Sequence, residues 1–311
     1  MITTITLNAS IDKCYHISNL VCAGTVSRVD AVTNTAGGKG LNVARVIAAC
    51  EEEVMASGFV GGYNGEYLIH LLEEDGIKHC FTKTESETRS CINIIASDGS
   101  STEYLEPGAA VKEDEIKSFL DQFDEIIAKS DVITISGSMP KGVPLDFYAT
   151  MISRAKEAGK KVILDTSGNA LLEGMKAGPT MVKPNDEELE AILGIRILSR
   201  EETIKAAKQL KEENKIEYVV VSLGSDGAMV VADDGIYHGR PPKLEAKNTV
   251  GCGDSMVAAF AVAMKRGYDI EKALTYAIAV SAANAINPGT GQVQKEDIAM
   301  ILPDVKIEKI S

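Results

Sequence analysis

Basic residues are scarce relative to acidic ones. The sequence has 32 Lys and Arg against 45 Asp and Glu, which gives a formal net charge of −13 at pH 7 and a pI near 4.9. Nucleic acids and anionic membranes are bound mainly through basic surfaces, so we expect neither as the main partner. Small anionic metabolites stay possible, because a few basic side chains in one cleft decide the local potential.

Long apolar runs are also missing. No stretch reaches the roughly 18 apolar residues that a membrane-spanning helix requires. Residues 1–10 show no basic segment followed by an apolar run, as a secretion signal would. We therefore expect a cytoplasmic protein without a membrane partner.

Cysteines and histidines lack the spacings that mark metal sites. There is no CxxC pair, which argues against a zinc site and against a disulfide framework. We expect reduced, mostly buried thiols at Cys14, Cys22, Cys50, Cys80, Cys91 and Cys252. We predict no catalytic or metal-binding role for His16, His70, His79 and His238, which have no spaced partner.

Two common nucleotide-binding signatures are absent as well. The glycine cluster TAGGKGLNVARVIAAC at residues 35–50 is not a Walker A loop, which would read GxxxxGK followed by Ser or Thr. Near the N-terminus, no strand is followed by GxGxxG and a helix. This argues against a Rossmann dehydrogenase.

The pattern that is present indicates one α/β domain over residues 1–311. Short β-branched runs alternate with amphipathic helical stretches, which predicts βαβ units on a mostly parallel sheet. Helical stripes are clearest at residues 116–127 and 270–278, and Asp269 is an expected N-cap of the second. We expect strands at residues 2–7, 131–138, 160–168, 179–185, 217–224 and 228–231.

Two stretches, at about residues 11–35 and 88–106, interrupt this alternation. Their apolar and polar residues alternate, and a turn signal occupies residues 97–100, so we expect antiparallel hairpin strands. These strands would form a small sheet inserted into the α/β domain. It could cover a cleft as a lid, or it could be an ordinary edge elaboration.

The strongest candidate for chemistry is NTVGCGDSMVAAFAVAMKRG at residues 248–267. Gly251, Cys252 and Gly253 form a turn into an expected helix, whose first backbone N–H groups can bind an anion. Asp254 follows the turn and could accept a hydroxyl proton during phosphoryl transfer. Helix capping would also explain Asp254, and this motif alone does not decide between the two.

The first glycine cluster offers further candidate contacts. Gly37 and Gly38 permit close backbone approach to a ligand, and Lys39 and Asn42 supply donors for hydroxyls and phosphate. The glycines could instead serve only a tight strand-to-helix turn.

Three more features can be interpreted in two ways each. Asn185 and Glu188 could hold a hydrated Mg²⁺, although helix capping alone would explain Asn185. The SLGSDG segment at residues 222–227 could contact a ligand or form a plain hairpin turn. Arg28 and Arg89 have the planar fork that suits phosphate, but either could be a solvated surface residue.

Together these residues resemble the ribokinase-like, or PfkB-type, carbohydrate kinases over essentially the whole chain. The most specific motifs are AGGKGLNVARV (36–46) and NTVGCGDSMVAAF (248–260). Supporting motifs are TLNASID (6–12), ETRSCINI (87–94), TEYLEPG (102–108), SGSMPKG (136–142), VKPNDEE (182–188) and SLGSDG. Ala9 and Ala109 replace common prolines, and Cys252 replaces alanine or serine, but no reacting group is lost.

The resemblance implies a three-layer αβα domain with a β-sheet lid, and often a dimer formed through the lids. It implies that Asp254 is the catalytic base and that Gly251, Cys252 and Gly253 bind the transferred γ-phosphate of ATP. By the same comparison the sugar contacts are Asp12, Gly37, Gly38, Lys39 and Asn42, and the substrate-phosphate contacts are Arg28, Arg89 and Ser138. ATP contacts would be Lys183, Asn185, Ser222, Gly224, Gly227 and Asn284, with Mg²⁺ held near Asn185 and Glu188 through water.

The expected reaction is ATP-dependent phosphorylation of a ketohexose monophosphate to a bisphosphate. Within the family the chain looks most similar to tagatose-6-phosphate kinases, with bacterial 1-phosphofructokinases second, so tagatose 6-phosphate is the preferred acceptor and fructose 1-phosphate the alternative. Two other interpretations stay open at this point. One is a regulator that binds these ligands without turnover, and the other is a kinase of an uncharged sugar or nucleoside.

Overall fold

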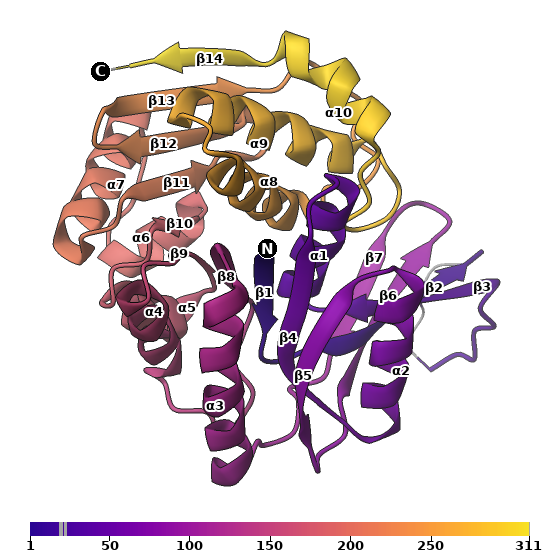
Figure 1. The fold of residues 1–311 in the computed structure, drawn as a ribbon. Coiled ribbons are helices and arrows are strands. Elements are labelled where there is room, and N and C mark those ends of the chain that lie inside the picture. The colour runs from indigo at the N-terminus through magenta and orange to yellow at the C-terminus, as the bar shows by residue number, and fades with distance from the viewer. Residues whose placement is uncertain (19–20, 22–23, 311) are drawn as a thin grey trace.

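A large mixed sheet forms the centre of the molecule (Figure 1). The computed structural model describes residues 1–18, 21 and 24–310. Within these residues ten strands form the sheet, and all neighbours from β11 to β5 are parallel, while β12, β13 and β14 pair antiparallel at one edge. In spatial order they are β14 (Lys306–Lys309), β13 (Gly235–Arg240), β12 (Ala228–Ala232), β11 (Tyr218–Ser222), β10 (Met181–Val182), β9 (Lys161–Asp165), β8 (Val132–Ser136), β1 (Ile2–Thr6), β4 (Val54–Gly61) and β5 (Lys78–Thr84).

Helices cover both faces of this sheet, and each face has its own apolar core. One core contains α1 (Lys39–Ala49), α2 (Gly62–Glu74), α8 (Cys252–Arg266), α9 (Ile270–Ala285) and α10 (Lys295–Ile301). The other contains α3 (Glu113–Lys129), α4 (Phe147–Glu157), α5 (Gly168–Met175), α6 (Asp186–Leu193) and α7 (Arg200–Asn214). Short 3-10 turns lie at η1 (Gly224–Asp226) and η2 (Leu302–Asp304). None of the described helices is long and apolar enough to cross a bilayer.

A second, small sheet lies beside α2, at the right of Figure 1. Its order is β3 (Ala31–Gly37), β2 (Ser10–Ile17), β6 (Arg89–Ala96) and β7 (Ser101–Leu105). The β2–β3 and β6–β7 pairs are antiparallel, while β2 and β6 join in parallel. The predicted fold class is confirmed: a three-layer α/β domain with a mostly parallel central sheet and a separate small sheet.

The expected thiol at Cys22 lies outside the described residues. The other five cysteines are free thiols, and of these Cys50 and Cys91 are buried. The expectation of mostly buried thiols is wrong for the described positions, because Cys14, Cys80 and Cys252 are only partly buried.

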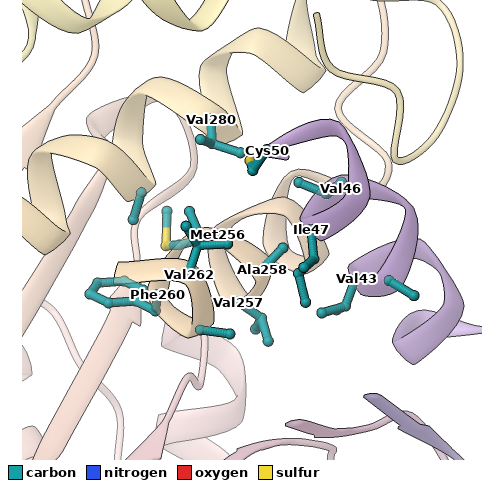
Figure 2. Close-up of a cluster of buried hydrophobic side chains, with 14 of the residues drawn as sticks. Val43, Val46, Ile47, Cys50, Met256, Val257, Ala258, Phe260, Val262 and Val280 are labelled. Carbon is teal, nitrogen blue, oxygen red and sulfur yellow. The ribbon is translucent and has the colours of Figure 1, made fainter. Parts of the chain in front are cut away.

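The core around α8 fixes the relative positions of α1 and α8. Every residue of α8 from Asp254 to Ala263 is buried, and its many alanines allow neighbouring helices to approach closely. Figure 2 shows Val43 and Ile47 of α1 facing Val257 and Ala258 of α8. The two glycine clusters of the sequence therefore meet at the starts of two helices that pack against each other.

Candidate active site

Asp254 is a buried carboxylate in the first turn of α8, with an exposed fraction of 7%. Asn42 on α1 donates its Nδ2 to Asp254 Oδ2 at 2.9 Å. Burial and the neighbouring Asp165 raise the pKa of Asp254 to about 6, although Asn42, Lys39 and Lys183 act in the opposite direction. A carboxylate with a pKa near neutrality is well suited to accept a proton from a reacting group.

Asp165 joins two lysines beside this carboxylate. Its Oδ1 lies 3.3 Å from Lys183 Nζ, and its Oδ2 lies 3.7 Å from Lys39 Nζ. Lys183 and Asp165 are buried, while the Lys39 side chain is 45% exposed. Asp165 was not among the residues predicted from the sequence, although an acidic residue at the carboxyl end of a parallel strand is a recognisable signal.

The start of α8 presents free backbone donors. Gly251 has a φ of 82°. The backbone N–H groups of Gly251, Gly253 and Asp254 donate to no acceptor among the described residues. A Cβ at Gly253 would lie 3.2 Å from Lys183 Nζ, so this ammonium group lies against the turn. Amide donors, a helix N-terminus and an ammonium group together can bind an anion.

Asn284 supports the same turn from the interior. It is fully buried, its Nδ2 donates to Val250 O at 2.9 Å, and its Oδ1 accepts from Gly291 N at 2.9 Å. The Nδ2 also lies 3.5 Å from Cys252 Sγ. Asn284 thus fixes the turn from behind, and its expected contact with ATP stays a prediction.

Asp12 and the first glycine cluster pack closely. Asp12 accepts a hydrogen bond from Ser10 Oγ at 2.6 Å, and burial is the main cause of its raised pKa. A Cβ at Gly37 would lie 2.0 Å from Asp12 Cγ, so a larger residue here would displace the Asp12 carboxyl group. Gly38 precedes α1 with a φ of 108°, in the region that favours glycine. These residues therefore reach the same end of α1 as Lys39 and Asn42.

Arg89 connects three segments that are distant in sequence. Its Nε and Nη2 donate to Asn8 O at 3.1 and 2.9 Å, and its Nη1 donates to Glu106 O at 2.8 Å. Asn8 in turn donates its Nδ2 to Ser138 Oγ at 3.1 Å. A guanidinium has five N–H donors, so two have no acceptor among the described residues and can bind a further group.

Arg28 is not brought into this network. It is exposed between β2 and β3 and makes no hydrogen bond or ion pair with a described residue. Its expected contact with a substrate phosphate stays a prediction.

Asn185 and Glu188 form a capping box at the start of α6. Asn185 Oδ1 accepts from Glu188 N at 2.7 Å, and Glu188 Oε2 accepts from Asn185 N at 3.1 Å. The box accounts for both residue types without a metal. Glu188 also lies close enough to Lys39 to help raise the pKa of that lysine, so the box borders the site.

The SLGSDG segment lies beside this capping box. Ser222 forms a parallel bridge with Asn185, and its N–H donates to Pro184 O at 3.1 Å. Gly224 is exposed, with a φ of 57°. Gly227 is buried with a φ of 87°, and a Cβ there would lie 2.0 Å from Gly239 O. Gly227 therefore has a packing role of its own, while a Cβ at the exposed Gly224 would meet no described atom within 4 Å.

Known proteins share this architecture. The chain matches the model of the pfkB family of carbohydrate kinases over residues 5–297. It is similar to phosphofructokinase-2 from Escherichia coli, solved in complex with potassium, at 31% identity over 97% of this chain and 98% of that chain, with a TM-score of 0.91. It is also similar to a protein described as a "possible 1-phosphofructokinase" from Thermotoga maritima, at 26% identity over 100% of both chains, with a TM-score of 0.87. Arabidopsis thaliana ribokinase, at 21% identity and a TM-score of 0.78 over 97% of this chain and 98% of that chain, confirms the ribokinase-like fold.

Proposed function

Because the chain belongs to the pfkB family of carbohydrate kinases, we propose that it transfers the γ-phosphate of ATP to a free primary hydroxyl of a ketohexose monophosphate. The family and the enzyme class expected from the motifs, a phosphotransferase acting on a sugar, are confirmed. The observation that carries the finer proposal is the buried Asp254 carboxylate beside unpaired amides at the start of α8.

In this reaction Asp254 accepts the proton of the attacking hydroxyl. The hydroxyl oxygen bonds to the γ-phosphorus while the bond to the bridging oxygen breaks, and ADP leaves. The amides of Gly251 and Gly253 and the Lys183 ammonium group stabilise the charge on the transferred phosphoryl group. The expected contribution of the Cys252 amide is less direct, because this amide donates to Thr249 O at 3.3 Å. Positioning and charge neutralisation supply most of the catalysis in such a reaction.

ATP binding falls to the edge formed by α6 and the SLGSDG segment. The proposed contacts are Lys183, Asn185, Ser222, Gly224, Gly227 and Asn284. No group of three or more His, Cys, Asp or Glu among the described residues could hold a metal directly. Mg²⁺ would be held near Asn185 and Glu188 through water, where it would neutralise charge on the ATP phosphates.

The proposed acceptor is tagatose 6-phosphate. The three motifs that favour it, at residues 87–94, 102–108 and 136–142, are joined through the Arg89 and Asn8 hydrogen bonds, which supports one shared substrate-phosphate site. Asp12, Gly37, Gly38, Lys39 and Asn42 would hold the sugar. The similarity to phosphofructokinases makes fructose 1-phosphate and fructose 6-phosphate the second candidates.

Steady-state kinetics test the proposal. Purified protein with ATP and Mg²⁺ is assayed for ADP release with tagatose 6-phosphate, fructose 1-phosphate, fructose 6-phosphate and ribose, and Asp254→Asn serves as the inactive control. We expect the highest kcat/KM with tagatose 6-phosphate. Binding of ATP and sugar phosphate without ADP release would instead identify a regulator, and faster turnover of ribose would reject a sugar-phosphate kinase. The proposed location is the cytoplasm, where ATP and sugar phosphates occur, and cell fractionation tests it.

A homodimer through the small sheet is a further part of the proposal. Apolar side chains are exposed on and beside this sheet, notably at Val26, Val32 and Leu105. Exposed apolar patches often mark protein–protein contacts. Light scattering of Val32→Asp and Leu105→Asp should show a monomer, whereas Leu198→Asp, exposed before α7, should stay dimeric. A monomeric wild-type protein would reject the proposed dimer but not the proposed kinase activity.

A further inference from the structure

We propose that Arg45 is a positioning residue that keeps the Asn42 amide oriented toward Asp254, an inference that rests on the proposed function of Asp254 as the base. Arg45 lies one turn after Asn42 on α1, and its side chain is 15% exposed. Its Nη1 donates to Asn42 Oδ1 at 3.2 Å, and Asn42 Nδ2 donates to Asp254 Oδ2 at 2.9 Å. The three side chains therefore form one directed chain of hydrogen bonds.

The chemistry of these groups allows only one orientation of the amide. A guanidinium has only donors, an ionised carboxylate has only acceptors, and the amide between them has one end of each kind. If the Asn42 amide turned over, its oxygen would face the Asp254 carboxylate and its NH₂ group would face Arg45. Both contacts would then be repulsive, so Arg45 disfavours the reversed amide.

Arg45 is itself held in place on two other sides. Its Nη2 donates to Ala36 O at 2.8 Å, and its Nε lies 3.2 Å from Asp75 Oδ2, just after α2. The packing of α1 against α8 keeps the distance from Asn42 to Asp254 fixed (Figure 2). A lysine at position 45 has no planar fork and cannot reproduce all three contacts.

The consequence falls on the protonation of Asp254. Asp165, Lys39 and Lys183 face this carboxylate from other elements, and Cys252 lies near it on α8. Arg45 faces Asp75 and acts on Asp12. A hydrogen bond donated to the charged form of an acid lowers its pKa, and Asn42 does so for Asp254. Without Arg45 the amide can turn over, so protonation of the base becomes easier.

The pH dependence of kcat distinguishes this role from a merely structural one. In Arg45→Met, which keeps a long side chain but has no donor, the acidic limb should move up by about one to two pH units. The loss of kcat should be largest below pH 7 and should mostly disappear by pH 9, with an unchanged KM for ATP. Arg45→Lys should recover part of the loss. An equal loss at every pH would overturn the proposal.

Arg154→Gln is the matched control, because it removes an arginine that pairs with Asp124 on the far face of the sheet. Its pH profile should equal that of the wild-type protein. A shifted profile in this control would show that any lost arginine has the effect, and would overturn the assignment to Arg45.

A second readout needs no turnover. In protein labelled with ¹³C-aspartate, the Asp254 carboxyl signal is the one that disappears in Asp254→Asn, and its titration gives the pKa directly. If no sugar phosphate is a substrate, the proposed function fails, but the titration of Arg45→Met still decides the role of Arg45. An unshifted pKa would overturn that role. Should Arg45→Met not fold, Asp75→Ala, which removes the acceptor of Arg45 Nε, should give a smaller upward shift, and no shift there would overturn it too.

Discussion

Replacing Asp254 by Asn should make the protein inactive and more stable at the same time. The asparagine keeps an oxygen that can accept the hydrogen bond from Asn42, so the local geometry is preserved. It cannot accept a proton, so turnover should fall by a factor of about 10² to 10⁴ while substrate binding changes little.

The stability change follows from the pKa of Asp254. Its folded-state value is raised from 3.8 to about 6, so the ionised form is disfavoured in the folded state. The stability linked to this group is fully present below pH 3.8 and is lost as the pH rises through 6. At about 1.4 kcal/mol per pKa unit, the ionised carboxylate costs about 3 kcal/mol at pH 7.5 and about half of that at pH 5. Asparagine carries no charge, so Asp254→Asn should raise the free energy of unfolding at pH 7.5 by at most about 3 kcal/mol.

Thermal unfolding checks this magnitude. We expect Asp254→Asn to raise the Tm by about 2 to 6 °C at pH 7.5, and by less at pH 5. Asp121→Asn, at an exposed position of α3, should leave both Tm and turnover unchanged. Full turnover in Asp254→Asn would refute the role of base. A lower Tm at pH 7.5, or an equal change at both pH values, would refute the argument from burial.

The other predictions concern pH, Arg89 and Gly227. Turnover should show an acidic limb near pH 6, with only about a tenth of the proposed base ionised at pH 5, and a kcat that is constant from pH 5 to 7 would contradict this. Calorimetry should show that Arg89→Ala weakens sugar-phosphate binding more than ATP binding. Arg89→Lys should restore little of the sugar-phosphate affinity, because the three hydrogen bonds of Arg89 need its planar guanidinium. Equal losses of affinity for both ligands would show that Arg89 has only a structural role. Gly227→Ala should lower the free energy of unfolding by about 2 kcal/mol or more, because the φ of Gly227 is 87° and Gly239 O occupies the place of a Cβ. An unchanged denaturation midpoint would contradict this.

Local patterns predicted six strands of the large sheet, namely β1, β8, β9, β10, β11 and β12, but not β4, β5 or β13. The runs at residues 131–138 and 160–168 contain β8 and β9, and Asp269 caps α9 by accepting from Lys272 N. Strand β14 was missed because it is four residues long and mostly charged, so only its pairing with β13 defines it. The parallel pairing of β2 with β6 was missed for a related reason, since local alternation does not identify a partner strand distant in sequence.

The site was predictable where glycine turns enter helices, and less so where its residues depend on neighbours in space. Asn42 and Asp254 were selected from separate motifs, and the structure joins them by a hydrogen bond. Arg45 was missed because an arginine on an amphipathic helix is ordinary in sequence. Asp165 was missed although its place at the carboxyl end of a predicted strand is a recognisable signal. Asn185 was selected from the sequence, but its role stays ambiguous, because both an N-cap and a site for hydrated Mg²⁺ favour asparagine.

The packing of α1 against α8 also affects how the protein folds during its synthesis. Asn42 and Asp254 are 212 positions apart in the chain, so the apolar face of α1 leaves the ribosome long before α8 has been synthesised. During that interval Val43 and Ile47 are available to chaperones, or to wrong associations. Catalytic competence can therefore appear only late in biogenesis, and recovery of turnover after dilution from denaturant would report completion of the whole tertiary structure.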